Sequence, residues 1–348
     1  MNATRSHPAR PTILAVDGGN SKTDVALVGR DGRLLAALRG PSSSHQVVGL
    51  ETGMAILDRL VRRALREAGL REDSRPVAER ALLCMAGADF ATDLRLLRRG
   101  VGRLGLADAV DIRNDAFAGL RAGASRPWGV VVVMGHGVNV GGVAPDGRSL
   151  VHAPGDHTSG DWGGGSEVGE RALSAAVRAR DGRGPRTSLE RLVPAFFGLT
   201  RPLALTRAIY EKRIPERRLD QVAPVVFRAA VEGDAVARGI VDWVADEAIG
   251  LARSAIRTLG LSRTDVEVVL SGGLFRNDDP IFHERVRAGI LAAAPGARVI
   301  PLTAPPVLGA ALLGLDLEGA GPRAEARLRA ELRSESIVIV NGGQETAR

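Results

Sequence analysis

Two stretches of the sequence repeat one pattern, in which three strand-like segments are joined first by a glycine-rich turn and then by an Asp-Gly turn. The first stretch, 12–38, has the turns Gly18-Gly19 and Asp31-Gly32, and the second stretch, 128–153, has the turns GHG and PDG. Asp-Gly is a strong signal for a tight hairpin, and the flanking apolar residues are typical of strands. Because a repeated supersecondary unit constrains the whole fold, the sequence predicts two domains that each begin with a three-stranded antiparallel meander.

Helices and strands are expected to alternate after each meander. Helical periodicity covers 50–69 and 91–104 in the first half and 280–293 and 306–315 in the second, with short apolar strands between the helices. This alternation predicts an α/β fold with two mixed sheets covered by helices. We expect the two domains to face each other across a cleft.

The domain boundary is expected near 115–126, where a helix should cross from one half to the other. We therefore predict a small N-terminal domain at 11–116 and a larger C-terminal domain at 117–318. Residues 1–10 are expected to be disordered. The stretch 319–348 begins with a charged, helix-like segment and has no assigned role.

The composition indicates a globular, cytoplasmic protein. The chain has 348 residues, 45% of them hydrophobic, no apolar run of membrane-spanning length and no signal-peptide pattern. The net charge is +7, but arginines alternate with acidic residues and aromatic residues make up only 3%, which argues against nucleic-acid binding. Cys84 is the only cysteine, so the chain has no internal disulfide.

The two glycine turns, Gly18-Gly19 and Gly135-His136-Gly137, are candidates for phosphate binding. Backbone N–H groups in such turns can point together at an anion. Asp17, at the end of the preceding strand, could hold Mg²⁺ through its carboxylate. Lys22, one of only two lysines in the chain, could supply a compact positive charge near the phosphates. The alternative is that both are hairpins whose glycines are required by sterics alone.

Two further motifs follow predicted strands. The first motif is Gly272-Gly273 with Asn277, where the glycines would let a flat ligand such as adenosine approach the backbone. The alternative is that this motif only ends a strand before a helix. Asn114-Asp115 lies between a strand and a helix, where Asp115 could cap the helix or accept a hydroxyl proton during phosphoryl transfer.

The stretch GDHTSGDWGGGSEVG, residues 155–169, is predicted to be a binding loop. Trp162 could cover the face of a sugar, while Asp161 or Glu167 could bind its hydroxyl groups. The alternative is a surface loop that is anchored by a buried tryptophan.

Together these motifs resemble the BadF/BadG/BcrA/BcrD ATPase family over about residues 11–317. That family includes N-acetylglucosamine and glucosamine kinases and belongs to the actin–Hsp70–sugar-kinase fold, so the resemblance implies two actin-like, ribonuclease H-like domains. DGGNSKTD looks like the family's first phosphate motif, MGHGVN its second and SGGLFRN its adenosine motif. NDA resembles the segment with the catalytic base, GDWGGG the sugar loop, and PSSSHQVVG the sugar-contacting segment of the small domain.

The resemblance implies an ATP-dependent kinase that transfers the γ-phosphoryl group of ATP, with Mg²⁺, to a hydroxyl of an amino sugar or hexose. It implies Asp115 as the catalytic base, Asp17 as the metal ligand and a homodimer as the assembly. The implied nucleotide-binding residues are Gly18, Gly19, Asn20, Ser21, Lys22, Thr23, Gly135, His136, Gly137, Gly272, Gly273 and Asn277. The implied sugar-binding residues are Ser44, His45, Asn114, Asn139, Asp161, Trp162 and Gly163.

The chain departs from the family pattern at several positions. Gly135-His136-Gly137-Val138 stands where Gly-Thr-Gly-Ser is common, and Ser44 stands where the family often has asparagine. An alternative is therefore an ATPase, or an ATP- or sugar-sensing protein of the family, without sugar kinase turnover. The family's reductase-activating branch holds a [4Fe–4S] cluster between two subunits. Four thiolates are usual for such a cluster, whereas one cysteine per chain gives a homodimer only two.

Overall fold

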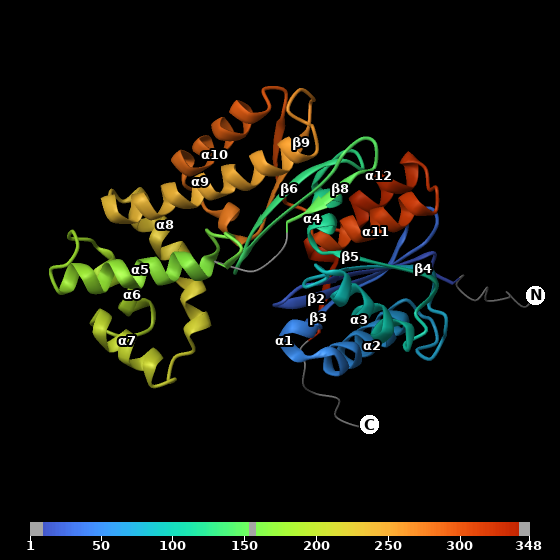
Figure 1. The fold of residues 1–348 in the computed structure, drawn as a ribbon. Coiled ribbons are helices and arrows are strands. Elements are labelled where there is room, and N and C mark those ends of the chain that lie inside the picture. Colours follow the sequence, from blue (N-terminus) through green and yellow to red (C-terminus); the bar gives the residue numbers. More distant parts are fainter. Residues whose placement is uncertain (1–9, 153–157, 341–348) are drawn as a thin grey trace, which may run out of the picture. The chain divides into compact units, whose positions relative to one another are not determined.

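The computed structural model describes residues 10–152 and 158–340, and the chain divides into two compact units. Unit 1 comprises Met1–Pro127 and Leu302–Arg348, and unit 2 comprises Trp128–Pro301 (Figure 1). This division differs from the predicted boundaries, because the helix after residue 116 and the segments after residue 302 belong to unit 1. Of the predicted disordered segment 1–10, residues 1–9 lie outside the described residues.

Unit 1 is built on a six-stranded mixed sheet with the strand order β11-β3-β2-β1-β4-β5. The strands are β1 (Ile13–Gly18), β2 (Lys22–Val28), β3 (Leu34–Pro41), β4 (Ala78–Met85), β5 (Ala107–Asn114) and β11 (Val338–Ile339). β1, β2 and β3 form the predicted antiparallel meander, and β4 and β5 continue the sheet in parallel beyond β1. The first predicted meander and the mixed sheet are therefore confirmed.

Helices cover both faces of the unit 1 sheet. They are α1 (His45–Val48), α2 (Leu50–Glu67), α3 (Ala91–Gly102), α4 (Ala116–Gly123), α11 (Pro306–Leu317) and α12 (Pro322–Glu331), with a short 3₁₀ turn at η4 (Ser334–Ser336). Successive residues of a strand point to opposite faces. Leu14 and Val16 of β1 therefore join the core with α2 and α3, whereas Ile13 and Ala15 join the core with α4 and α11.

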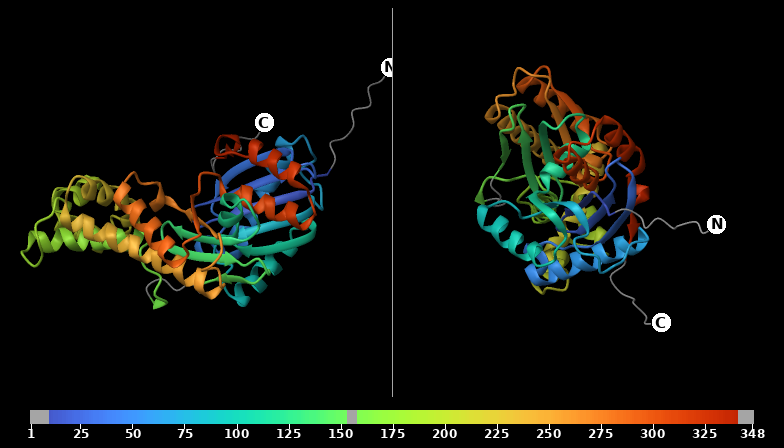
Figure 2. Two further views of the ribbon diagram at one scale, coloured as in Figure 1. Left: turned by 90° about the horizontal axis from the view of Figure 1, so that it is seen from above. Right: turned by 90° about the vertical axis from the view of Figure 1, so that its right-hand side faces the viewer.

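The stretch after residue 318, which had no assigned role, is part of unit 1. Figure 2 shows α11 and α12, in red, beside the blue strands of the first sheet. Leu328 of α12 is fully buried, and β11 pairs in parallel with β3. Arg121 of α4 is only 3% exposed and pairs with Asp316 of α11 and Glu325 of α12. This buried cluster ties the C-terminal helices to the first half of the chain.

Unit 2 is built on a five-stranded sheet with the order β10-β9-β6-β7-β8. The strands are β6 (Gly129–Met134), β7 (Val138–Val143), β8 (Ser149–Val151), β9 (Glu267–Ser271) and β10 (Arg298–Pro301). β6, β7 and β8 form the second antiparallel meander, and β9 and β10 continue it in parallel beyond β6. The order matches β5-β4-β1-β2-β3 of unit 1, so the repeat in the sequence is a repeat of topology.

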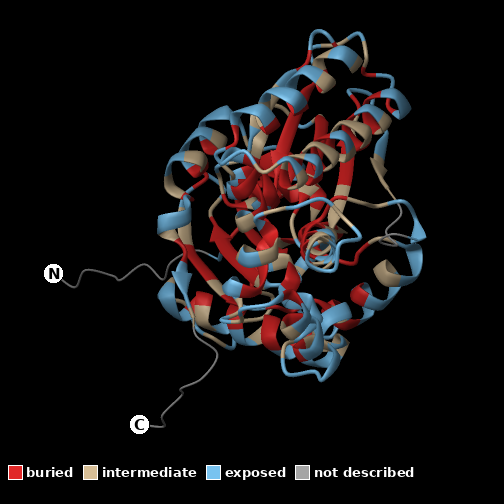
Figure 3. Ribbon diagram, turned by 90° about the vertical axis from the view of Figure 1, so that its left-hand side faces the viewer, coloured by how far each residue is buried: buried red, intermediate tan, exposed pale blue. Residues whose placement is uncertain are grey.

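The remaining helices belong to unit 2. They are α5 (Gly165–Arg180), α6 (Leu189–Phe196), α7 (Pro202–Tyr210), η2 (Glu216–Val222), α8 (Ala223–Val231), α9 (Ala235–Thr258), η3 (Gly273–Arg276) and α10 (Pro280–Ala293). α9 packs on β6 and β7, and α10 packs on α9. Fully buried residues lie on the strands, such as Val130 of β6, and on the inward faces of the helices, such as Val244 of α9 (Figure 3). No helix in the described part of the chain is both long enough and apolar enough to cross a membrane.

Candidate functional site

The first glycine turn joins β1 to β2 in unit 1. The Gly19 N–H donates to the Lys22 carbonyl over 2.9 Å, which closes the turn. A Cβ atom on Gly18 would lie 2.5 Å from a methionine sulfur, so close packing requires glycine at this position. Asn20 and Ser21 at the tip are exposed. The tip of the turn is therefore accessible, and phosphate binding by this turn stays a prediction.

A row of charged side chains crosses the sheet beside this turn. Asp17 on β1 lies opposite Asp24 on β2, and Asp24 lies opposite Arg39 on β3. Arg39 donates to both oxygens of the fully buried Asp24, each over 2.7 Å. Lys22 Nζ lies 2.5 Å from Asp24 Oδ2 and 3.8 Å from Asp17 Oδ2. Lys22 is therefore held by two carboxylates at the foot of the turn.

Sequence reasoning missed Asp24 and Arg39. The signal for Asp24 was an acidic residue in an otherwise apolar strand, since a buried charge is almost always paired. Its partner Arg39 could be found only from the register of β2 on β3.

Asp17, the candidate metal ligand, lies where a negative charge is poorly solvated. Asp17 is 7% exposed, and burial raises its pKa to about 7. The Lys22 charge opposes this rise, whereas the charges of Asp24 and Asp115 add to it. Mg²⁺ is commonly bound by one or two carboxylates together with phosphate oxygens and water. Asp17 beside an open turn fits that pattern, although no group of three or more potential metal ligands occurs among the described residues.

Asp115 stands directly before α4, yet its side chain makes no capping hydrogen bond. Asn114 caps the helix instead, because its Oδ1 accepts a hydrogen bond from the Ala116 N–H over 2.9 Å. The Nδ2 of Asn114 donates to Asp89 Oδ1 over 2.6 Å. Burial, together with the charge of Asp89, raises the pKa of Asp115 to about 6. Backbone hydrogen bonds from Asp115 and Ala116 lower this pKa without offsetting the rise. A carboxylate with this pKa is suited to accept a proton near neutral pH.

The predicted sugar segment packs against the first glycine turn. Ser42 Oγ donates to the Gly19 carbonyl over 2.9 Å, and Thr23 Oγ1 donates to Ser43 Oγ over 2.8 Å. Thr23 is fully buried. The Thr23 hydroxyl is thus used within unit 1, and its contact with a nucleotide stays a prediction.

Ser44 and His45 carry the clearest sign of a ligand site in unit 1. The Ser44 Oγ and His45 Nδ1 atoms are buried and have no hydrogen-bond partner among the described residues. A buried polar atom of this kind costs about 1–3 kcal/mol unless something satisfies it. Burial raises the pKa of Asp89, and the nearby His45 acts in the opposite direction. The predicted sugar-binding residues His45 and Asn114 thus gather around Asp89, a residue that sequence reasoning missed.

The second glycine turn joins β6 to β7 in unit 2 and is packed against the start of α5. The N–H groups of Gly165 and Ser166 donate to the carbonyls of Gly135 and His136, over 2.8 and 3.1 Å. A Cβ atom on Gly164 would lie 2.6 Å from the His136 carbonyl oxygen. The consecutive glycines of GDWGGG are therefore needed for the approach of α5 to the turn.

The side chain of His136 has two partners from distant segments. His136 Nδ1 lies 3.0 Å from Asp220 Oδ2 on η2, and Ser166 Oγ lies 3.2 Å from His136 Nε2. The imidazole is still 55% exposed. Asp220 is 84 residues from His136 in the chain, so no local pattern could have indicated this pair.

A cavity of about 430 Å³ in unit 2 brings two of the predicted motifs together. It is lined by Gly135, His136, Gly165, Asp220, Gln221, Ala223, Pro224, Phe227, Gly273, Leu274, Arg276 and Asn277. One part of this lining is apolar, with Phe227 and Leu274, and another carries the second glycine turn. A nucleotide needs this combination, because its base is flat and largely apolar whereas its phosphates are charged.

Asn277 lines the cavity, but its amide is used within unit 2. Its Nδ2 donates to the Leu274 carbonyl over 2.6 Å, and its Oδ1 accepts from the Asp279 N–H over 2.8 Å. Asn277 therefore shapes the turn between η3 and α10. Gly272 lies behind the cavity with a φ of +105°, and a Cβ atom there would lie 2.2 Å from the Met134 carbonyl oxygen.

The other predicted sugar-binding residues, except Ser44, belong to unit 2. Asn139 on β7 is opposite Val133 of β6. Asp161 accepts from Ser159 Oγ over 2.8 Å, and Trp162 is partly buried. Gly163 has a φ of +97°, which favours glycine. Residues 153–157 of the predicted binding loop lie outside the described residues.

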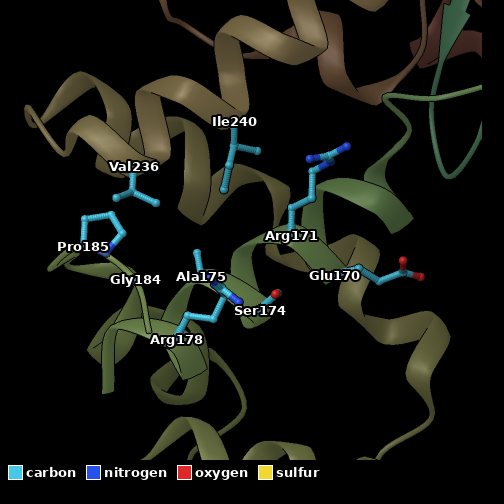
Figure 4. Close-up of a pocket in the computed structure, with 9 residues that line it drawn as sticks. All are labelled: Glu170, Arg171, Ser174, Ala175, Arg178, Gly184, Pro185, Val236 and Ile240. Atoms are coloured by element: carbon cyan, nitrogen blue, oxygen red, sulfur yellow. The ribbon is translucent and has the colours of Figure 1, made fainter. Parts of the chain in front are cut away.

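Another cavity of about 430 Å³ lies elsewhere in unit 2, between α5 and α9. Figure 4 shows its lining, with Arg171, Ser174 and Arg178 from α5, Val236 and Ile240 from α9, and the loop at 184–185. None of the motif residues lines this cavity, so it is distinct from the site that the motifs define.

Two units of repeated topology, each with a glycine turn between its first two strands, define the chain as an actin-like protein of the kind found among sugar kinases and related ATPases. Within this class, the chain belongs to the BadF/BadG/BcrA/BcrD ATPase family, whose sequence pattern matches residues 14–314. The fold and the recognised family are therefore confirmed.

Two relatives of similar length are known by name. The chain is 28% identical to the N-acetyl-D-glucosamine kinase of Dictyostelium discoideum, over 88% of this chain and 99% of that protein. It is 27% identical to an N-acetylmuramic acid/N-acetylglucosamine kinase of Clostridium acetobutylicum, over 78% of this chain and 88% of that protein.

Solved structures show the same fold at lower identity. A structure described as an N-acetylglucosamine kinase candidate from Chromobacterium violaceum superposes with a TM-score of 0.71 at 22% identity, covering 88% of this chain and all (100%) of that one. A ROK hexokinase from Thermus thermophilus superposes with a TM-score of 0.51 at 23% identity, covering 88% of this chain and 98% of that one.

Proposed function

We propose that the protein is an ATP-dependent kinase that phosphorylates a hydroxyl of an amino sugar, N-acetylglucosamine or a close relative. Both named relatives are N-acetylglucosamine kinases, and they align over most of their own lengths. The cavity of about 430 Å³ in unit 2 would hold the nucleotide, and the Asp17 and Asp115 carboxylates of unit 1 would serve the metal ion and the proton transfer.

The observation that carries the proposal is the environment of Asp115. Its carboxylate does not cap α4, its pKa is raised to about 6, and Asn114 and Asp89 lie beside it. A general base works best when its pKa lies near the working pH. An aspartate whose carboxylate is held mainly by helix N–H groups would instead have a lowered pKa.

The proposed reaction uses Asp115 as the base. The sugar oxygen attacks the γ-phosphorus, its new O–P bond forms as the bond from the γ-phosphorus to the β,γ-bridging oxygen breaks, and ADP leaves with that electron pair. The hydroxyl proton passes to Asp115. Mg²⁺ held at Asp17 would neutralise charge on the phosphates. Ser44 and His45, with their unsatisfied buried atoms, would orient the sugar.

A screen of ADP release over glucosamine, N-acetylglucosamine, N-acetylmuramic acid, glucose and mannose tests this proposal. We expect release to be stimulated most by an N-acetylated amino sugar, and NMR of the product would locate the phosphate. If the purified protein does not bind ATP with Mg²⁺ in calorimetry, the proposal is wrong. Tight nucleotide binding without sugar-stimulated turnover would favour the alternative of a sensing protein. This alternative is suggested by His136 and Val138, which depart from the common Gly-Thr-Gly-Ser pattern.

We also propose that the protein acts as a homodimer in the cytoplasm, with its sugar and ATP as small-molecule partners and with no nucleic-acid or membrane partner. The dimer is an implication of the family resemblance, and light scattering on the eluting protein tests it. A monomer at micromolar concentration would contradict it.

A further inference from the structure

We propose that His136 is a phosphate-binding residue that takes up a proton when the nucleotide binds, with Asp220 holding its Nδ1 atom. The inference rests on the proposed function, since it assumes that the 430 Å³ cavity of unit 2 is the nucleotide site. It goes further by assigning a role to the residue that departs from the common Gly-Thr-Gly-Ser pattern.

The position of His136 is the first argument. His136 and Asp220 line the same cavity as Gly273 and Asn277 of the adenosine motif. The imidazole belongs to the second glycine turn, where phosphate oxygens are expected, and it is 55% exposed. A ligand that fills the cavity from Phe227 to the turn would therefore meet the imidazole with its phosphates.

The hydrogen-bond partners of the imidazole also support this role. When Nδ1–H donates to Asp220 Oδ2 over 3.0 Å, the neutral ring has a lone pair at Nε2. Ser166 Oγ lies 3.3 Å from Nδ1 and 3.2 Å from Nε2, so it contacts both nitrogens and is not aligned with the Nε2 lone pair. A phosphate oxygen can only accept hydrogen bonds, so the neutral ring in this orientation has nothing to donate to it.

Protonation resolves this mismatch. The imidazolium donates from both nitrogens, so Nδ1–H can keep Asp220 while Nε2–H turns to the phosphate. Charge-assisted hydrogen bonds of this type are also stronger than neutral ones. The proton comes from solvent, and the bound phosphate and Asp220 together flank the positive ring.

Other polar and charged groups reach the surroundings of the ring from three elements. On η2 the ring faces Asp220, and on α5 it faces Ser166, with Glu167 beside the neighbouring Gly164. On η3, Arg276 lines the cavity and supplies a permanent positive charge. Histidine has an ordinary pKa of about 6.5 and therefore changes charge in the physiological range. Neither Arg276 nor a hydroxyl in the usual motif would do so.

Calorimetry of Mg·ADP binding tests the inference. We expect Mg·ADP binding to the wild type to take up protons, measured as the dependence of the binding enthalpy on the ionisation enthalpy of the buffer. His136→Gln should abolish this uptake and weaken Mg·ADP by about tenfold, the lower end for a hydrogen bond to a charged group. Adenosine, which has no phosphate, should bind both proteins equally and without proton uptake.

Two further variants make the test specific. His152→Gln removes a histidine of the same unit whose Nε2 lies 3.2 Å from Ser254 Oγ, and it should behave as wild type. Asp220→Asn keeps an acceptor for Nδ1–H but removes the negative charge, so proton uptake should persist and move to lower pH. That shift is not expected if Asp220 has only a structural role.

The outcomes separate this inference from the proposed function. Equal proton uptake and equal Mg·ADP affinity in the wild type and His136→Gln would overturn the inference while leaving the kinase intact. If His136→Gln does not fold, an unchanged pH dependence in Asp220→Asn would overturn it instead. Absence of Mg·ADP binding to the wild type would overturn both.

Discussion

The two glycine turns occupy the same place in two sheets of the same topology, yet they are chemically opposite. The turn of unit 1 is flanked by Asp17 and Asp24, and Lys22 at its foot pairs with both carboxylates. The turn of unit 2 has a single imidazole beside one carboxylate, and its neighbours on α5 are glycines packed against its carbonyls.

The difference shows how two units of the same topology can take different roles in one protein. Topology places a turn at the end of each first strand, but side chains decide what each turn can hold. Buried carboxylates suit a metal ion and a proton acceptor. A turn rich in N–H groups with a protonatable ring suits phosphate oxygens. We therefore expect substitutions in unit 1 to affect chemistry and pH dependence, and those in unit 2 to affect nucleotide affinity.

The largest expected effect concerns Asp115. Asp115→Asn keeps the shape of the side chain but cannot accept the sugar proton, so kcat should fall by about 10²–10⁴. The Kd for Mg·ADP should barely change. Steady-state kinetics and calorimetry measure the two quantities. In the wild type, activity should also decline below about pH 6, as the carboxylate becomes protonated.

Asp108→Asn is the matched control, because Asp108 is an exposed aspartate on β5, the strand that ends just before Asp115. It should leave kcat unchanged. Sugar phosphorylation by Asp115→Asn at a normal rate would remove Asp115 from the mechanism and direct attention to Asp161 or Glu167.

The second prediction concerns the stability of unit 1 and its dependence on pH. An unfolded aspartate has a pKa of about 3.9, whereas that of folded Asp17 is about 7. Between these values the folded state binds more protons, so the free energy of unfolding falls as pH rises, by an upper limit of about 4 kcal/mol. The Asp17→Asn variant has no titrating group at this position, so its free energy of unfolding does not fall in this way. Without metal, it should match the wild type near pH 4 and be more stable at pH 7.5.

Urea titrations followed by circular dichroism measure this effect. All three tryptophans, Trp128, Trp162 and Trp243, lie in unit 2, so tryptophan fluorescence provides an internal reference for the other unit. A pH dependence that is identical in Asp17→Asn and the wild type would contradict the prediction.

The third prediction concerns the wall of the cavity in unit 2. Gly272→Ala places a Cβ atom where the Met134 carbonyl oxygen leaves no room, at a φ of +105°. We expect a loss of about 1–3 kcal/mol in the free energy of unfolding, seen by tryptophan fluorescence, together with weaker Mg·ADP binding.

The neighbouring Gly273 provides the control for stability. A Cβ atom there would meet no heavy atom within 4 Å, so Gly273→Ala should be nearly neutral in urea. Equal stability of the two variants would show that the backbone at Gly272 is less constrained than its geometry indicates.

The smallest expected effect concerns Thr23 in the first turn. Thr23→Val removes the hydrogen bond to Ser43 from a fully buried position and should cost about 1 kcal/mol. Thr23→Ser keeps the hydroxyl and serves as the control. Because Thr23 points into unit 1, neither variant should change the Kd for Mg·ADP. A change in nucleotide affinity that is specific to Thr23→Val would instead support the nucleotide contact implied by the family motif.

The sequence alone determined the repeated meanders, the alternating helices and strands, both glycine turns and the family. These features depend on residues that are close in the chain. Apolar residues recur with a period of about 2 in strands and about 3.6 in helices, and Asp-Gly favours a tight turn. The range 280–293 is an example, because the predicted helix and the observed α10 coincide.

Only the tertiary structure decided which distant residues meet. Asp89 reaches Asn114, and Asp220 reaches His136 across 84 residues. The C-terminal helices join unit 1 because Arg121 is buried between Asp316 and Glu325, which moved the boundary away from the predicted one. Such contacts leave no local pattern in the chain. They form because a buried polar group must find a partner wherever packing brings one within reach.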